Sequence, residues 1–301
     1  MSATTRAQLQ VHLCVLLWGF TAIFGRLISL PALPLVFWRM SIVALVLAGV
    51  PAVWRSCRGM PARLLAAYAG VGVLLALHWL TFYAAIKLSN ASVGATCMAL
   101  APVLLAFLEP LFTRRRFDPR DILLGVAAVA GVAAVLGGIP SGMRLGVAVG
   151  ALSAALVAVF GALNKRLVHH GDALAVTAIE IAAGAALMAA LAPFLPHEGP
   201  AFPIPGPRDA ALLLALSLGC TLLPFWLHLV ALRHLTAFWV ALATNLEPVY
   251  AILLAMPLLG EHHDLAPRFY LGVAIILAAV VVYPLLRRRD PPADSYGAWL
   301  A

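Results

Sequence analysis

Long apolar stretches follow one another along almost the whole chain, and this feature constrains the fold most. The 301 residues are 63% hydrophobic and only 11% charged, and the mean hydropathy is +1.00. Stretches of about 18 or more apolar residues span a bilayer as helices, whereas barrel strands are shorter and alternate. We therefore predict an all-α integral membrane protein. The ten expected transmembrane helices cover residues 10–28, 34–53, 64–86, 91–112, 121–138, 145–165, 172–194, 209–231, 236–258 and 268–286.

The expected helices contain the same pattern twice. Residues 84–103 align with residues 230–249 at a constant offset of 146 without a gap, and both copies hold a proline, Pro102 and Pro248, in the same place. Each copy has five helices, and because five is an odd number the second copy enters the membrane upside down. Inverted repeats are typical of secondary transporters, whose substrate site lies where the halves meet. The expected units are a first repeat over residues 1–138, a second, inverted repeat over residues 139–290, and a flexible cytoplasmic tail over residues 291–301.

Basic residues are concentrated in the loops on one side of the expected membrane. If the amino terminus is cytoplasmic, 14 Lys and Arg residues face inward and 5 face outward, while Arg39 lies inside a span. Cytoplasmic loops carry this excess in membrane proteins, so both termini are expected in the cytoplasm. The same distribution explains the net charge of +8 without nucleic-acid binding. The 4 cysteines form no Cys-x-x-Cys pair, and we expect neither a metal nor a cofactor.

Several short motifs resemble a known family in their order and spacing. They are Trp18-Gly19, Phe37-Trp38-Arg39, the region 84–109, and Pro248 through Leu259-Gly260-Glu261. With two inverted halves of five helices, the chain is similar to the drug/metabolite transporter superfamily and specifically to its EamA-type members. The resemblance implies export of small organic metabolites, such as amino acids or their derivatives, across the bacterial cytoplasmic (inner) membrane. One departure is that Arg114-Arg115 stands in the first half where the second half has Gly260-Glu261, which argues against a role for that acid in both halves.

The clearest candidate site surrounds Glu247, which lies about 16 Å into the ninth expected helix and so near the membrane midplane. A charge at that depth costs on the order of 2.5–3.5 kcal/mol on insertion scales, so it needs a reason. Pro248 removes a backbone hydrogen bond beside it, Asn245 is close in sequence, and Thr244 and Tyr250 can share its helix face. We expect a substrate or proton site beside a broken helix; the alternative is a structural hydrogen bond to a neighbouring helix.

Other polar and aromatic side chains within the spans are further candidates. Glu180 and Arg39 are candidates for proton coupling or an ion pair, although their expected depths differ by about 10 Å along the membrane normal. His78 is expected either to bind a carboxylate or carry a proton, or to bond a backbone carbonyl as a buried histidine. The remaining residues expected to line the same cavity are Trp79, Trp18, Thr21, Phe160, Asn164 and Trp226.

Two other classes of membrane protein are less consistent with the sequence than a transporter. A membrane-bound transferase enzyme should show an Asp-rich metal motif or a His-Asp pair at a helix end, and a membrane scaffold should lack a buried acid between the repeats. Among carriers, the Trp-rich lining suits a multidrug or aromatic-compound efflux carrier as well as a metabolite exporter. We expect a transporter without enzymatic activity, working by alternating access, whose partners are a small-molecule solute and the lipid bilayer; the sequence leaves a homodimer open.

Overall fold

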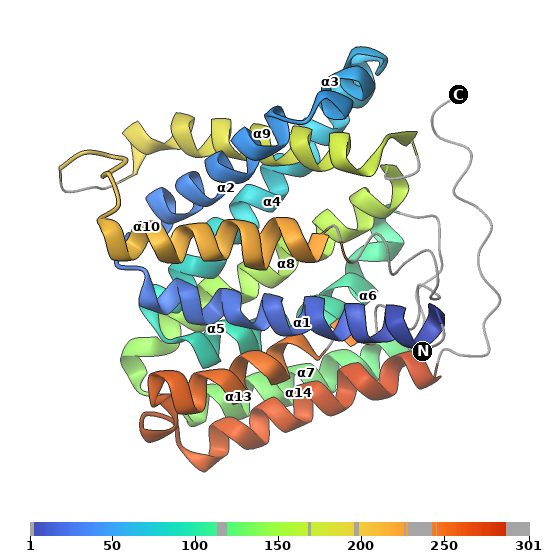
Figure 1. Cartoon of the computed structure of the whole chain (residues 1–301). Helices are drawn as coiled ribbons and strands as arrows, with labels where there is room; N and C mark the ends of the chain where they lie inside the picture. Colours follow the sequence, from blue (N-terminus) through green and yellow to red (C-terminus); the bar gives the residue numbers. More distant parts are fainter. Residues whose placement is uncertain are drawn as a thin grey trace.

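A computed structural model of the chain describes residues 3–112, 119–167, 170–195, 199–225, 227, 243–244 and 246–286. Every regular element in these ranges is a helix, and the helices lie side by side in one bundle (Figure 1). Five of them are long and apolar enough to cross a membrane, and one bent helix pair would raise this number to six. Four more apolar helices have 10–17 residues. The chain is therefore a multi-pass membrane protein, while the number of ten spans stays a prediction.

The elements follow the order that the hydrophobic stretches predict. In the first half they are α1 (Ala3–Leu27), α2 (Ala32–Ala48), α3 (Pro51–Arg58), α4 (Ala62–Leu88), α5 (Ala91–Met98), α6 (Ala101–Phe112) and α7 (Pro119–Gly137). In the second half they are η1 (Ser141–Met143), α8 (Arg144–Leu167), α9 (Ala173–Leu191), η3 (Ala192–Phe194), α10 (Pro207–Leu214), the π-helical η4 (Ala215–Leu222), α13 (Glu247–Leu259), η5 (Glu261–His263) and α14 (Pro267–Leu286). Residues 228–242, where two expected helices end and begin, lie outside the described ranges.

The expected helix over residues 34–53 is wrong at its carboxyl end. Helix α2 already ends at Ala48, and α3 starts at Pro51 in a direction that differs by 86°. The reason is local, because a residue that precedes proline avoids the helical region of backbone space. Val50 accordingly has an extended conformation, with φ −95° and ψ 109°, and the chain turns there.

Two helices break at equivalent places in the two halves. The expected helix over residues 91–112 is divided by a turn at Ala99 and Leu100, and α6 then begins at residue 101. Helix α13 begins at residue 247, directly after a turn at Leu246, so the two starts keep the repeat offset of 146. Pro102 and Pro248 are the second residues of α6 and α13. Proline has no N–H to donate and is tolerated in the first turn of a helix, so the shared proline marks where each helix restarts.

Matched helices of the two halves pack against each other. The pairs are α2 with α9 and α7 with α14, while α13, which matches α6, packs against α5 of the same expected span. Gly138 at the end of α7 lies against Phe269 at the start of α14, and Gly131 lies against Gly272, so these two helices run antiparallel. An inverted repeat predicts this relation between its last helices.

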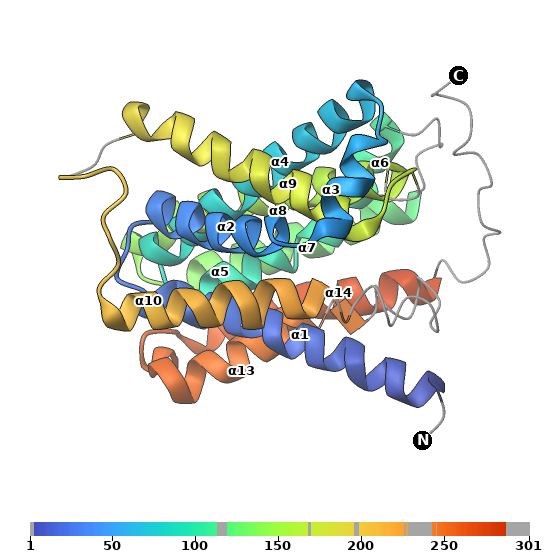
Figure 2. The same cartoon turned by 45° about the horizontal axis from the view of Figure 1, so that its top comes forward.

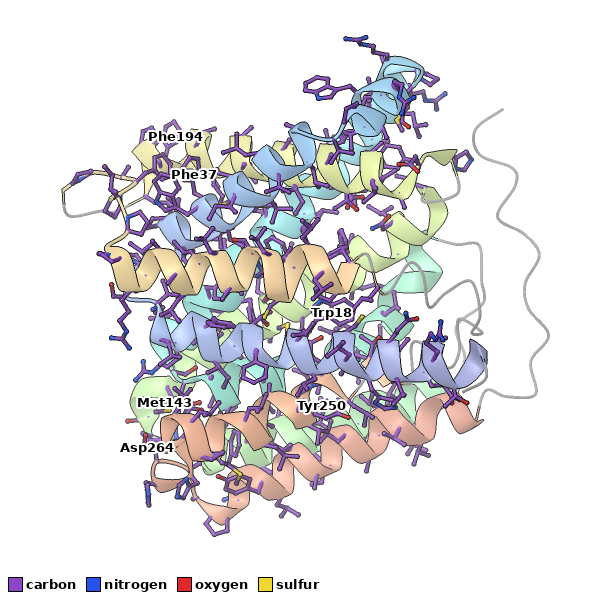
Figure 3. The ribbon with its side chains drawn as sticks, in the orientation of Figure 1. Trp18, Phe37, Met143, Phe194, Tyr250 and Asp264 are labelled. Atoms are coloured by element: carbon purple, nitrogen blue, oxygen red, sulfur yellow. The ribbon has the colours of Figure 1, made fainter. Side chains whose placement is uncertain are left out.

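The two ends of the bundle can be followed in the figures. Helix α1 begins and helix α14 ends at the same end of the bundle, whereas Met143 and Asp264 lie at the opposite end (Figures 1 and 3). Helix α1 lies between α13 on one side and the continuous helix of α10 and η4 on the other (Figures 1 and 2). On the outside of α7, Ile122, Leu123, Val126 and Val129 are between 55% and 70% exposed. Aliphatic exposure of this kind suits a lipid environment.

A buried carboxylate joins two elements at the end of the bundle that carries Asp264. Asp209 in the first turn of α10 accepts hydrogen bonds from the backbone N–H and the hydroxyl of Ser29, in the turn between α1 and α2. We expect Asp209→Ala to lower the free energy of unfolding by about 1–3 kcal/mol, because it leaves two donors without their charged acceptor. Unfolding in mixed micelles by titration with dodecyl sulfate measures this change. An unaltered unfolding midpoint would contradict the role of this carboxylate.

Candidate functional site

A buried cation lies where α2, α4 and η4 meet. Arg39 of α2 is only 3% exposed, and its guanidinium carbon lies 3.7 Å from the centroid of the Trp79 ring. Its Nη1 donates to the hydroxyl of Tyr83 (2.6 Å), and its Nε donates to Oγ1 of Thr221 (2.9 Å). We call these four residues the Arg39 cluster. Cation–π contact and two hydrogen bonds hold the guanidinium in one orientation.

The geometry of the Arg39 cluster follows from the local structure of its helices. Trp79 and Tyr83 are one helical turn apart on α4, so both rings face the same neighbour. Thr221 lies in the π-helical segment, and its hydroxyl donates to the carbonyl of Leu216, five residues earlier (2.9 Å). Because the hydroxyl proton is used in that bond, the oxygen is left to accept from Arg39. Single π-helical turns within helices are frequent at functional sites.

His78 joins the two halves of the chain beside this cluster. Its Nδ1 lies 2.8 Å from Oγ and 3.1 Å from the carbonyl oxygen of Ser153 on α8, and the Ser153 hydroxyl donates to the carbonyl of His78 (2.8 Å). Since the serine proton is used there, Nδ1 carries the ring proton of a neutral His78 and Nε2 is the acceptor. Nε2 has no hydrogen-bond partner among the described residues. His78 thus makes the hydrogen bond to a backbone carbonyl that was expected of a buried histidine, and it makes it through Nδ1.

The two candidate acids lie in different surroundings. Glu247, the first residue of α13, is half-buried and interacts electrostatically with Arg39 and Tyr83. Glu180 on α9 is 3% exposed, and its Oε1 has no hydrogen-bond partner within the described part of the chain. Its electrostatic neighbour is Tyr68. The structure therefore places Glu247, and not Glu180, near Arg39, although no ion pair links Arg39 to either acid in the described ranges.

The candidates on α1 and Tyr250 of α13 form a second group. Trp18 meets Phe225 edge-on, with ring centroids 6.4 Å apart, and the hydroxyl of Thr21 donates to the carbonyl of Trp18 (2.6 Å). Tyr250 faces α1, where its hydroxyl lies 3.3 Å from Nδ1 of His12 (Figure 3). These contacts join α1 of the first half to Phe225 and to α13 of the second half.

The remaining candidates lie on α8, just before α13, or outside the described residues. Phe160 on α8 is partly buried and packs against the main hydrophobic core, and Oδ1 of Asn164 is buried without a partner in the described ranges. Thr244 lies just before the break at Leu246 and is partly buried. Trp226 and Asn245 lie outside the described residues.

Sequence reasoning missed three polar residues that join distant helices. Thr221 and Ser153 bind Arg39 and His78, as described above. Glu261, which follows α13, is 4% exposed, and its two carboxylate oxygens accept from the backbone N–H groups of Ala91 and Ser92 (2.8 Å each). It therefore caps the first turn of α5 in the other half of the chain. The sequence signal for it was the Gly260-Glu261 pair, which does not reveal the partner.

Comparison with known proteins gives three findings. Residues 5–137 and 144–300 each match the EamA-like transporter family. A solved structure that is described only as the crystal structure of a protein is similar over 95% of this chain and 98% of its own, with a TM-score of 0.61 and 19% sequence identity. At that identity the likeness concerns the fold alone. No curated protein matches the sequence.

Proposed function

The chain belongs to the EamA-like transporter family, and from this premise we propose that it is a secondary active transporter that exports a small organic metabolite, such as an amino acid or an amino acid derivative. The observation that carries the proposal is the Arg39 cluster together with Glu247, the acid at the restart of α13. Broken helices near the middle of the membrane are where carriers with inverted repeats bind their substrates.

The composition of the group supports alternating access as the mechanism. Arg39 and Tyr83 come from the first half of the chain, whereas Thr221 and Glu247 come from the second. A site that is built from both halves changes its shape and its opening when one half tilts against the other. The proposed repeats remain residues 1–138 and 139–290.

Glu247 is the proposed residue for coupling transport to protons, because it is a half-buried acid near a buried cation and next to a helix break. Solute uptake is measured in inverted membrane vesicles with and without a pH gradient across the membrane. We expect Glu247→Gln to lose the part of the uptake that depends on the gradient. The neutral amide cannot bind and release a proton. Labelled amino acids and their derivatives serve as the solutes.

The control for this prediction is Asp264→Asn, which removes the same charge from an exposed residue at one end of the bundle. It should transport as the unchanged protein does. Equal gradient-dependent rates for the unchanged protein and Glu247→Gln across a pH series would exclude Glu247 as the proton carrier.

A second candidate substrate class is aromatic or drug-like compounds. It is favoured by the aromatic rings in this region. The rings of His78 and Phe82 stack with their centroids 6.1 Å apart, and the Trp79 ring contacts the face of the Arg39 guanidinium. Competition between aromatic cations and amino acids for the same transport would separate the two classes.

The proposed location is the cytoplasmic (inner) membrane of a bacterium, with both termini in the cytoplasm. It is supported by the first and last described helices, because α1 begins and α14 ends at the same end of the bundle (Figure 1). The short helix α3 carries Arg55 and Arg58 in its last turn, as expected of an inward-facing connection. Reporter fusions at both termini test this orientation.

A further inference from the structure

Arg39 is a buried cation whose direct hydrogen-bond partners carry no charge. Its donors Nε and Nη1 bind the hydroxyls of Thr221 and Tyr83, and its face covers Trp79. Burying a charge without a counter-ion in contact is costly, and such groups are normally paired. In the described part of the chain no carboxylate forms an ion pair with Arg39, and Glu247 acts on it only electrostatically. Arg39 is therefore a cation held in one orientation, and no anion of the described residues contacts it.

The remaining nitrogen of the guanidinium, Nη2, is the donor group that the Arg39 cluster leaves unused. Nη2 of Arg39 makes no hydrogen bond within the described ranges. The buried side-chain atoms without a partner in those ranges belong to Asn90, Ser92, Asn164, Glu180 and Tyr270. Nη2 is not among these enclosed atoms, although Arg39 as a whole is only 3% exposed. The two N–H donors of Nη2 belong to a planar guanidinium, whose fork of donors fits a carboxylate.

We propose that this free edge of Arg39 binds the carboxylate of the transported solute, and that the solute is an amino carboxylate whose ammonium group faces Glu247. The inference rests on the proposed function and adds the residues that bind each charge of the solute. Glu247 is half-buried and has no hydrogen-bond partner among the described residues. A cation from the first half and an anion from the second, near each other but not in contact, match the two charges of a zwitterion. A dianion such as a phosphate ester would instead be repelled by Glu247.

The hydroxyl groups explain why Arg39 does not close the gap to Glu247 itself. Tyr83 and Thr221 come from α4 and η4, and together with the Trp79 ring they fix three sides of the guanidinium. A side chain held in this way keeps its open edge oriented before the solute arrives, which reduces the ordering cost of binding. Tyr83 and Thr221 are thus positioning residues, and Arg39 is the group that touches the solute.

The test is equilibrium binding to the purified full-length protein in detergent. The probes are the standard amino acids, followed for each one that binds by its decarboxylated amine and its deaminated acid. We expect at least one amino acid to bind, and both analogues to bind about 10- to 100-fold more weakly, since each lacks one charge-assisted interaction. Arg39→Gln should weaken the binding of the amino acid by a similar factor and leave the affinity for the decarboxylated amine unchanged. Tyr83→Phe keeps the charge of Arg39 but removes one hydrogen bond that orients it. It should therefore weaken the binding of the amino acid by a smaller factor.

Several outcomes would overturn the inference, and they differ from a failure of the proposed function. If no amino acid binds, or if the decarboxylated amine binds as well as its parent, Arg39 is not a carboxylate anchor. If Arg39→Gln does not fold, the inference is decided by Tyr83→Phe and by the analogue series on the unchanged protein. Arg144→Gln, which removes an exposed arginine at the start of α8, is the matched control and should bind normally. Solute transport in proteoliposomes tests the carrier function independently, since a carrier of amines would still transport.

Discussion

Replacing Gly72 with alanine is expected to destabilise the protein strongly. A Cβ at this position of α4 would lie 2.2 Å from the carbonyl oxygen of Glu180 and 2.6 Å from its Cα. Both atoms belong to the backbone of α9, so no side-chain rotation relieves the overlap, and the two helices must move apart. We expect the free energy of unfolding to fall by about 3 kcal/mol or more, at the upper end of the costs of overpacking. Thermal unfolding of the purified protein in detergent measures the loss.

The same helix offers a matched control for this substitution. Gly70 lies two residues earlier on α4, and a Cβ built there meets no heavy atom within 4 Å. Gly70→Ala should therefore be neutral or slightly stabilising, since alanine is favoured over glycine in a helix by about 1 kcal/mol. If Gly72→Ala and Gly70→Ala unfold at the same temperature, the close approach of α4 and α9 at Glu180 is wrong. A loss confined to Gly72→Ala shows that small residues bring the helices together, as is usual in membrane proteins.

The arrangement of helices was largely predictable from sequence because it depends on local properties. Hydrophobic length places the spans, and the offset of 146 between Pro102 and Pro248 identifies the repeat. The family match over residues 5–137 and 144–300 confirms the resemblance that these patterns indicated. The same prolines lie at the helix restarts. The expected helices ran through both positions, and a broken helix was expected only beside Pro248. A proline in an apolar stretch is compatible with a kink as well as a break, and only the packing decides between them.

The contacts of the candidate site were harder to predict because they join residues that are far apart in sequence. Thr221 binds Arg39 across 182 positions, whereas two partly buried threonines bond within their own helices. Thr81 donates to Leu77, and Thr177 donates to Ala173, each one turn earlier. Hydroxyl side chains in membrane helices commonly bond in this way, so residue type alone does not identify the one that binds a neighbour. Arg39 and Glu180 were candidates for an ion pair on charge alone, and the structure gives them different neighbours.

Glu261→Ala is expected to be the second strongly destabilising change. The carboxylate of Glu261 accepts from the N–H groups of Ala91 and Ser92, and the side chain of Asn90 accepts from Val93. Together they satisfy the first turn of α5, which has only 8 residues and is buried along most of its length. Without Glu261, two buried donors lose a charged acceptor, and the negative charge no longer complements the amino end of the helix. We expect a loss of about 2–5 kcal/mol in the free energy of unfolding.

Two variants distinguish this cap from a general effect of charge on the loop. Glu261→Gln keeps one acceptor oxygen but places an N–H₂ group against a backbone donor, so its stability should fall between those of Glu261→Ala and the unchanged protein. Asp264→Asn removes an exposed charge three residues later and should be neutral. A cysteine in place of the buried Ser92, in a protein whose Cys57 is serine, should react faster with a maleimide after Glu261→Ala, because the first turn of α5 then opens. Unchanged reactivity would show that α5 is held by packing against α8 and α13, and the carboxylate would then be dispensable for its first turn.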